Sequence, residues 1–195
     1  LILRNMVADQ KVRDVRIYSR FAPKWLEDSS GVIFAGTMTR LPEETTPIQD
    51  EIFTMDQTGA ITQLTAYANR YQDQEITIFD SALSPNGNSV AFWVDYLPSA
   101  SRLNSLPDQG SMGLGSLSIL DLRSGEVVDL CVPGSGVYYS MPVWSPDNRY
   151  ILTSIAQHTP SGETYQGSVY IIDVEKSVIF AIADNLLEVG WMGLP

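Results

Sequence analysis

The side chains that most often carry out catalysis or bind metals are scarce in this sequence. It has one histidine, His158, and one cysteine, Cys131. His158 lies in the polar stretch AQHTPSG, beside no obvious Ser or Cys nucleophile, and no G-x-S-x-G motif occurs. One histidine and one cysteine cannot build an ordinary zinc site, and no carboxylates have the spacing of a calcium-binding EF-hand loop. We therefore expect no catalytic residues, no metal site and no cofactor.

Three aspartates recur at equivalent places. Each ends a stretch of alternating apolar residues, in DEIFTMD, GSLSILD and GSVYIID, at Asp56, Asp121 and Asp173. A short turn-like segment follows each one, and an aspartate that opens a tight turn accepts backbone N–H groups about two residues further along. We therefore predict that these carboxylates close turns and do not form a shared site.

The segments around these aspartates repeat as a unit. MPVWSPDNRYILTSI, residues 141–155, has the same layout as DSALSPNGNSVAFWV, residues 80–94. Proline presets the backbone of a tight turn, and Asn148 or Gly87 supplies the left-handed residue that closes a hairpin. The alternation on both sides of each turn has the period of a β-strand. The unit is therefore strand, tight turn, strand, long loop, strand, tight turn, strand.

We expect three intact units and two incomplete ones. Gly, Pro, Ser and β-branched residues interrupt every candidate helix, which favours an all-β chain. The two ends either complete a fourth unit together or belong to a longer series of units. The intact units cover about residues 21–65, 78–132 and 139–183, and the partial ones residues 1–20 and 184–195.

Tryptophans mark the first strand of these units. Trp25, Trp144 and Trp191 occupy equivalent positions, which predicts that they pack between neighbouring units. Four-stranded antiparallel units that recur every roughly 40 to 60 residues are typical of a β-propeller, whose blades bury their faces against one another. We therefore predict one β-propeller segment over residues 1–195, with three complete four-stranded antiparallel blades plus partial blades at both ends.

One motif also resembles a known family. In Pro142–Arg149 the pattern P-x-W-S-P-D precedes an apolar strand and, later, Y-I-I-D-V, which resembles the WD-like repeat of TolB-type β-propellers. Pro85, Asn86 and Gly87 match it in the second unit. The resemblance implies a propeller fold and an extracytoplasmic location, that is periplasmic, secreted or envelope-associated. Related repeats occur in Tol translocation proteins and in prolyl-oligopeptidase-like enzymes, so the resemblance specifies a fold more than a function.

Composition narrows the range of partners. The chain has 12 Lys and Arg against 23 Asp and Glu, a formal net charge of −11. This charge repels phosphate backbones and anionic lipid headgroups, although acidity also serves solubility alone. No apolar run approaches the roughly 18 residues that span a bilayer. We therefore expect neither a nucleic-acid partner nor a membrane span.

The long loops contain the residues best suited to binding. In a four-stranded blade the two tight turns lie on one face, and the loop between the second and third strands lies on the other. Here those loops cover about residues 36–50, 95–115 and 157–167, which is long for hairpins. Tyrosine and arginine are enriched at interaction surfaces, although tyrosines also cap blade ends. On this long-loop face the candidate binding residues are Arg40, Tyr96, Arg102, Tyr138, Tyr139, His158 and Tyr165, and connections between blades add Tyr67 and Tyr71.

Together these features predict a non-catalytic binding or scaffold module that holds a protein or peptide on the long-loop face. One alternative is an accessory, substrate-gating propeller of a prolyl-oligopeptidase-like hydrolase whose catalytic domain is not in this chain. A weaker one is a metal-dependent lactonase-type propeller with Asp80 as a calcium ligand, although an aspartate there more often bonds nearby backbone. Apolar faces left open at the end blades would favour self-association or docking into a larger assembly.

Overall fold

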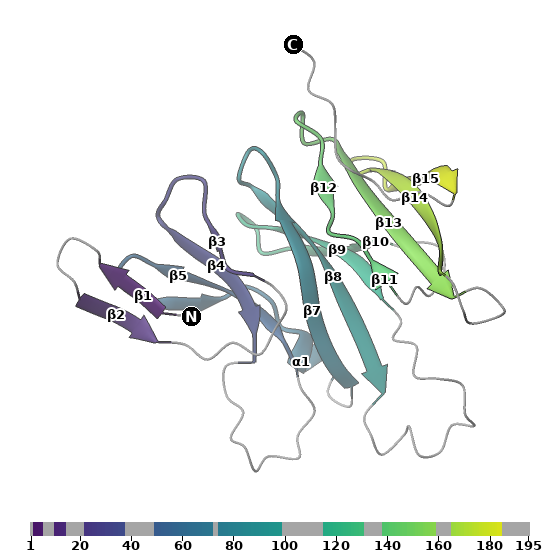
Figure 1. The fold of residues 1–195 in the computed structure, drawn as a ribbon. Coiled ribbons are helices and arrows are strands. Elements are labelled where there is room, and N and C mark those ends of the chain that lie inside the picture. Colours follow the sequence, from purple (N-terminus) through teal and green to yellow (C-terminus); the bar gives the residue numbers. More distant parts are fainter. Residues whose placement is uncertain are drawn as a thin grey trace. The chain divides into compact units, whose positions relative to one another are not determined.

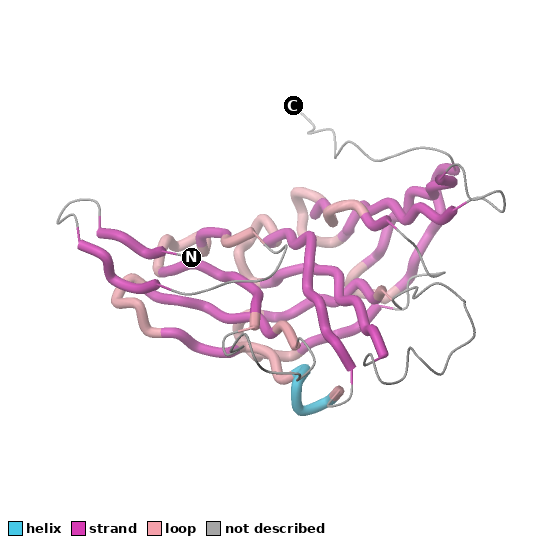
Figure 2. The backbone as a smooth tube through the Cα atoms, turned by 60° about the horizontal axis from the view of Figure 1, so that its bottom comes forward, coloured by secondary structure: helices cyan, strands magenta, loops and turns pink. Residues whose placement is uncertain are grey.

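A computed structural model describes eight stretches of the chain (Figure 1): residues 2–5, 10–14, 22–37, 49–71, 74–98, 115–130, 138–158 and 165–184. Strands and the turns between them make up nearly all of this part (Figure 2). Its one helix, α1 (Tyr67–Arg70), has four residues. The all-β prediction is therefore confirmed. The sequence did not reveal α1, because a single turn is too short to show helical periodicity.

The first four-stranded sheet is antiparallel, with its strands in chain order. It contains β3 (Lys24–Trp25), β4 (Gly31–Gly36), β5 (Glu51–Asp56) and β6 (Ile61–Gln63). A separate two-stranded sheet precedes it in the chain, formed by β1 (Ile2–Asn5) and β2 (Gln10–Asp14).

The second and third sheets follow the same order. The second contains β7 (Gln74–Leu83), β8 (Ser89–Pro98), β9 (Ser116–Asp121) and β10 (Val127–Leu130). In the third, the first strand is interrupted, so that β11 and β12 both pair with β13. The members of the third sheet are β11 (Tyr138–Tyr139), β12 (Val143–Trp144), β13 (Tyr150–His158), β14 (Tyr165–Asp173) and β15 (Val178–Asp184). The number of blades and their boundaries stay predictions.

Tight turns join the strands as the sequence predicts. Gly87 and Asn148 have φ of 67° and 63°, the left-handed conformation expected between the first and second strands. Gly59 and Gly125 adopt it in the turns after β5 and β9, with φ of 85° and 73°. Glycine adopts this conformation without the steric cost that a β-carbon brings, which is why the turns close within a few residues.

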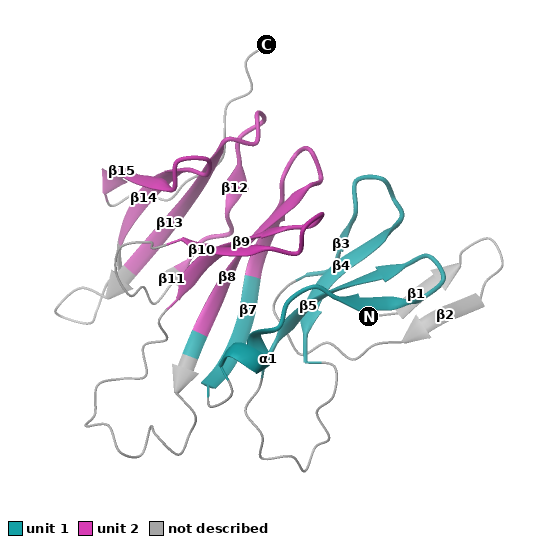
Figure 3. Ribbon diagram, turned by 180° about the vertical axis from the view of Figure 1, so that it is seen from behind, with its two compact units in different colours: residues 1–79, 96–106 teal, residues 80–95, 107–195 magenta. Residues whose placement is uncertain are grey.

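The described chain divides into two compact units, which Figure 3 colours separately. Unit 1 consists of residues 1–79 and 96–106, and unit 2 of residues 80–95 and 107–195. Apolar side chains fill the interior of each. In unit 1, Val32, Phe34, Phe53 and Met55 form one cluster. In unit 2, the large side chains with no exposed surface include Phe92, Trp93, Leu117, Leu120 and Ile151.

The tryptophans do not behave alike. Trp144 is buried, and its indole N–H donates to the Ala82 carbonyl at 3.0 Å, so its predicted packing against the preceding blade is confirmed. Trp25 is 62% exposed, and the prediction of burial is wrong for it. Within unit 1, the described residues that precede Trp25 form only the two-stranded β1–β2 sheet, whereas a full sheet precedes Trp144. Trp191 lies outside the described residues.

Candidate functional site

Three tyrosine rings meet in unit 1, and we call Tyr67, Tyr71 and Tyr96 the tyrosine cluster. The Tyr71 and Tyr96 rings lie 4.8 Å apart, centroid to centroid, and Tyr67 lies 6.2 Å from Tyr71 and 6.5 Å from Tyr96. These separations are within the range of favourable aromatic contacts. Tyr67 is buried, whereas Tyr71 and Tyr96 keep part of their surface open to solvent. The cluster thus combines a buried base with two accessible rings.

A buried carboxylate positions α1 and its tyrosines. Glu51, at the start of β5, is only 5% exposed. It accepts a hydrogen bond from the Ala68 N–H at 2.7 Å and another from the Thr65 hydroxyl at 2.5 Å. The Ala68 N–H is one of the groups that the first turn of a helix cannot satisfy internally. The Glu51 carboxylate satisfies it and so fixes a helix too short to be stable alone.

Gln49 holds the other end of α1. Its side-chain amide donates to the Tyr71 carbonyl at 2.9 Å and to the Gln74 carbonyl at 3.3 Å. The neighbouring Asp50 accepts from the Ile78 N–H at 3.1 Å and from the Thr37 hydroxyl at 3.0 Å. These contacts tie the segment before β5 to the backbone around β7, so the tyrosine cluster rests on a rigid base.

Arg70 adds a positive charge to the tyrosine cluster. Its guanidinium carbon lies 5.3 Å from the centre of the Tyr71 ring, within the range of a cation–π contact. Arg70 is exposed. Aromatic faces with an adjacent guanidinium can stack on apolar groups and hydrogen-bond to carbonyls or carboxylates, which are the contacts that a peptide offers.

The structure divides the predicted binding residues between two groups. Tyr96 joins Tyr67 and Tyr71 in unit 1, as the three were expected to share a face. Tyr139 lies in unit 2, where its ring is 4.3 Å from that of Trp93 and only 6% of its surface is exposed. This contact gives Tyr139 a place in the packing of unit 2, and a role in binding stays a prediction.

Tyr139 has little freedom to move. A β-carbon added at Gly115 would collide with the end of the Tyr139 ring. Next to it, the Ser140 carbonyl accepts a hydrogen bond from the Trp93 indole at 2.9 Å, and the Ser140 hydroxyl accepts one from the Ser154 N–H at 2.7 Å. The interruption between β11 and β12 is therefore tied to β8 and β13 by side chains.

Of the remaining predicted residues, some are described only by their backbone, and the others lie outside the described part of the chain. His158 and Tyr165 are opposite each other in the register of β13 and β14, at the end where the chain passes from one strand to the other. Tyr138 is in β11. Arg40 and Arg102 lie outside the described residues. Their assignment to a binding face stays a prediction.

Sequence reasoning missed the residues that support the cluster, although Glu51 carried a signal. In the alternation of β5, Glu51 shares a face with Phe53 and Met55, which are buried. A carboxylate at a core-facing position must be hydrogen-bonded to offset its desolvation. Gln49 and Arg70 had no comparable signal, because both stand in segments without a regular pattern.

The aspartates that end the third strands close turns, as predicted. Asp56 accepts from the Thr58 hydroxyl at 2.6 Å and from two backbone N–H groups. The Thr58 hydroxyl, followed by the Ala60 N–H, lowers the pKa of Asp56 below its ordinary value of 3.8. The backbone N–H and then the hydroxyl of Ser124 lower the pKa of Asp121 in the same way. Hydrogen bonds to an ionised carboxylate favour its charged form.

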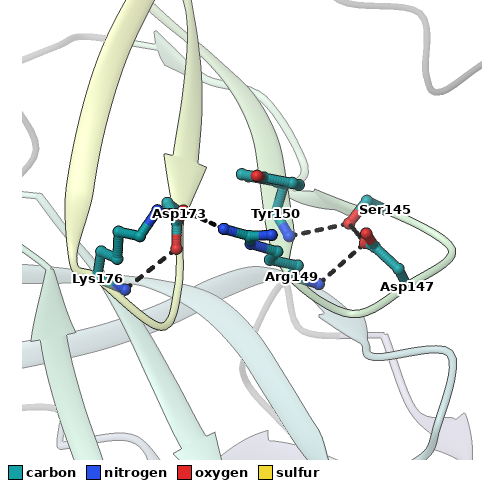
Figure 4. A network of polar contacts seen from close by, with 6 residues as sticks. All are labelled: Ser145, Asp147, Arg149, Tyr150, Asp173 and Lys176. Carbon is teal, nitrogen blue, oxygen red and sulfur yellow. Dashed lines mark hydrogen bonds and ion pairs between the residues drawn. The ribbon is translucent and has the colours of Figure 1, made fainter.

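The third such aspartate, Asp173, also forms ion pairs (Figure 4). Its carboxylate lies 3.5 Å from the Arg149 guanidinium and 3.4 Å from the Lys176 ammonium. Burial acts to raise the pKa of Asp173, but the Lys176 N–H and both positive charges together lower it. Arg149 belongs to the turn before β13 and Lys176 to the turn after β14, so this carboxylate joins two hairpin turns.

The adjacent turn, from Ser145 to Tyr150, is closed by its own hydrogen bonds, also shown in Figure 4. The Ser145 hydroxyl donates to Asp147 at 2.5 Å and accepts from the Tyr150 N–H at 2.9 Å. The Asn148 side-chain oxygen accepts from the Asn86 N–H at 2.8 Å, which joins the equivalent turns of the second and third sheets. These polar contacts account for the Ser-Pro-Asp motif as a structural element.

Within the described stretches, no group of three or more His, Cys, Asp or Glu side chains is arranged to hold a metal ion. The same part of the chain has no helix with the length and apolar character needed to cross a membrane.

Comparisons by sequence find no match, either to protein-family models or to curated proteins. Solved structures do match. TolB from Acinetobacter baumannii aligns with a TM-score of 0.51 and 19% identity over 92% of this chain and 36% of its own. The fold is that of a TolB-like β-propeller. The sequence-based prediction of this fold is thus confirmed.

Two other matching structures are enzymes by name. An oligogalacturonate lyase from Vibrio parahaemolyticus has a TM-score of 0.54 at 15% identity, over 98% of this chain and 48% of its own. Dipeptidyl peptidase 4 from Porphyromonas gingivalis has a TM-score of 0.56 at 11% identity, over 85% of this chain and 25% of its own. The chain therefore spans less than half the length of these proteins, and identities this low show the fold alone.

Proposed function

We propose that this chain is a non-catalytic binding module that holds a protein or peptide on the long-loop face of a TolB-like propeller, with Tyr71, Tyr96 and Arg70 as the principal contacts. Its three large sheets are the three complete blades of one propeller segment. The proposed location is extracytoplasmic, because the repeats resemble those of TolB-type propellers. The proposed partner is not a nucleic acid, because a net charge of −11 repels phosphate backbones.

The observation that carries the proposal is the tyrosine cluster on its buried polar support. Two partly open rings lie 4.8 Å apart, and the helix that leads to Tyr71 and carries the exposed Arg70 is held by Glu51, which is 5% exposed. Rigid aromatic side chains give contact area at low entropic cost, which is why Tyr and Arg dominate binding hot spots. Tyr96 lies near the end of β8, three residues before the long segment 99–114. The sequence predicts a loop there, and binding residues are commonly carried by loops on a rigid scaffold.

A random-peptide display library, selected against the full chain, tests the proposal. We expect enriched peptides whose affinity, measured by calorimetry, falls about fivefold or more with Tyr71→Ala or Tyr96→Ala. Tyr150→Ala is the matched control, because the Arg149 guanidinium lies 5.1 Å from the Tyr150 ring in a similar pair that belongs to unit 2. Thermal melts show whether each variant remains folded. Peptides insensitive to the cluster but lost on changing Asn86 or Asp147 would place binding on the tight-turn face and refute the proposal.

The second candidate function is substrate gating for a prolyl-oligopeptidase-like hydrolase. It is favoured by the alignment with dipeptidyl peptidase 4, of which this chain covers 25%. Reading the coding sequence on both sides of this segment separates the two. A G-x-S-x-G motif with an aspartate and a histidine downstream supports gating, and further propeller repeats alone support the binding module.

A further inference from the structure

The turn between β7 and β8 is closed by the side chain of Asn86. The Asn86 side-chain oxygen accepts from the Asn88 N–H at 3.0 Å and from the Ser84 hydroxyl at 2.8 Å. The Gly87 N–H donates to the Ser84 carbonyl at 2.8 Å. Asn86 is exposed. Its side chain therefore acts in this turn as a hydrogen-bond acceptor.

A carboxylate fills the same role in the equivalent turns of the other two large sheets. In the third sheet, Asp147 accepts from the Ser145 hydroxyl at 2.5 Å and from the Arg149 N–H at 3.1 Å. In the first sheet, Asp28 accepts from the Ser30 N–H at 2.9 Å. The turn of the second sheet is thus the exception, with an amide where the other two have a carboxylate.

The amide nitrogen of Asn86 is the part of this side chain that the turn does not use. Both donors reach its oxygen, and within the part of the chain that the structure describes its nitrogen donates no hydrogen bond. A carboxylate in its place would offer the same two donors a charged acceptor, and hydrogen bonds to a charged acceptor are shorter and stronger. An aspartate at position 86 would therefore fit this turn as Asp147 fits its own.

The residue after Asn86 supplies the chemistry for this change. Gly87 follows it, in the only Asn-Gly pair of the sequence. In such a pair the backbone nitrogen of glycine can attack the side-chain carbonyl carbon of asparagine, because glycine has no β-carbon to hinder the approach. A bond forms between this nitrogen and that carbon, and ammonia leaves, which gives a five-membered cyclic imide. Water then opens the imide, so that amide and water become carboxylate and ammonium with no other reactant.

The closed turn slows this reaction, because the attacking Gly87 nitrogen is engaged by the Ser84 carbonyl. An exposed turn at the end of two strands opens locally at a much lower free energy than the whole domain unfolds, and the attack takes place in that opened state. The neighbouring Asn88 is better protected. Attack on it requires the nitrogen of Ser89, which has a β-carbon, begins β8 and donates to the Ser84 hydroxyl at 2.9 Å.

We propose that Asn86 is a site of spontaneous deamidation, at which the folded protein gains a carboxylate that the turn retains. The imide opens at either of its two carbonyls. Opening at the former side-chain carbonyl gives aspartate, which keeps the acceptor in place. Opening at the other gives isoaspartate, whose extra main-chain carbon lengthens the turn and displaces the acceptor. Each conversion adds one negative charge to a chain whose formal net charge is −11.

Incubation of the full folded chain in mildly alkaline buffer, followed by peptide mapping with mass spectrometry, tests the site. We expect the mass gain of deamidation at Asn86 and not at Asn88, at a rate that falls about tenfold or more in Gly87→Asn, where a β-carbon hinders the attack. Gly87→Asn is the matched variant, because Asn148 holds the equivalent position of the third sheet with φ of 63°. A mass gain at Asn86 that occurs only in urea, or no faster than at Asn88, overturns the proposal, as does an unchanged rate in Gly87→Asn.

Urea titration in physiological salt tests whether the turn retains the product. Asn86→Asp reproduces the deamidated residue and should unfold at a urea concentration no lower than that of the unmodified chain, because the carboxylate keeps both donors. Asn86→Ala removes the acceptor and should lower the midpoint, as Asp147→Ala should in the equivalent turn. A midpoint for Asn86→Asp below that of the unmodified chain would show that the carboxylate does not fit the turn and would also overturn the proposal.

Discussion

Removing the Trp144 side chain should destabilise unit 2 strongly. A buried tryptophan removes about 150 to 250 Å² from water, which corresponds to roughly 4 to 6 kcal/mol as an upper limit. Trp144 is 8% exposed, and its indole N–H is bonded to the Ala82 carbonyl at 3.0 Å. For Trp144→Ala we therefore expect a loss of about 3 to 5 kcal/mol in the free energy of unfolding.

Two further variants separate the contributions. Trp144→Phe keeps an aromatic ring but leaves the Ala82 carbonyl without its donor, and should cost about 1 to 2 kcal/mol. Trp25→Ala changes the equivalent residue of the first sheet, which is 62% exposed, and should cost less than about 1 kcal/mol. Trp25 and Trp144 are the same residue type at equivalent positions of the repeat, so a difference between their alanine variants measures the effect of burial.

Urea titration followed by circular dichroism, with calorimetry for Tm, measures these losses. A loss of 3 to 5 kcal/mol in a chain of this size lowers Tm by about 6 to 20 °C. A shift in Tm of no more than a degree for Trp144→Ala would contradict the burial of its side chain. Equal losses for Trp25→Ala and Trp144→Ala would also contradict it, because the difference in their burial would then have no effect on stability.

Two further results are expected. Gly115→Ala should lower the free energy of unfolding by about 1 to 3 kcal/mol in urea titrations, since the new methyl group would displace the buried Tyr139 ring; an unchanged midpoint would show that the ring moves freely. Asp56 and Asp121 have lowered pKa values when folded, so the stability that they provide is present above about pH 4 and is lost as pH falls through those folded values. Unfolding midpoints between about pH 2 and pH 6 should therefore decline less steeply for Asp121→Asn than for the exposed control Glu175→Gln, and equal slopes would exclude this role for the Asp121 turn.

The repeat made the strands predictable because each strand ends at a residue with a local physical role. Asp56, Asp121 and Asp173 each end a third strand, and Gly87 and Asn148 have the left-handed conformation that was expected. These features depend on a few neighbouring residues, so one sequence suffices to find them. The propeller fold follows from their recurrence.

Burial could not be predicted from the same pattern, because it depends on what lies opposite each residue. Trp25 and Trp144 occupy equivalent positions in the repeat, yet one is 62% and the other 8% exposed. Trp144 lies against β7, whose Ala82 carbonyl accepts its indole N–H, whereas most of the Trp25 side chain is open to solvent. A repeat therefore defines equivalent positions but not equivalent environments.

The same reasoning separates the tyrosines that composition alone had grouped together. Tyr96 and Tyr139 were both expected on a binding face because each flanks a long loop or a connection between blades. Tyr139 is 6% exposed, packed against the Trp93 ring, and confined at Gly115, so replacing it would report on folding as much as on binding. Tyr96 keeps part of its surface accessible within the tyrosine cluster, so its removal disturbs packing less than removal of Tyr139 does and reports more directly on ligand binding. A test of binding should therefore begin with Tyr96 and Tyr71.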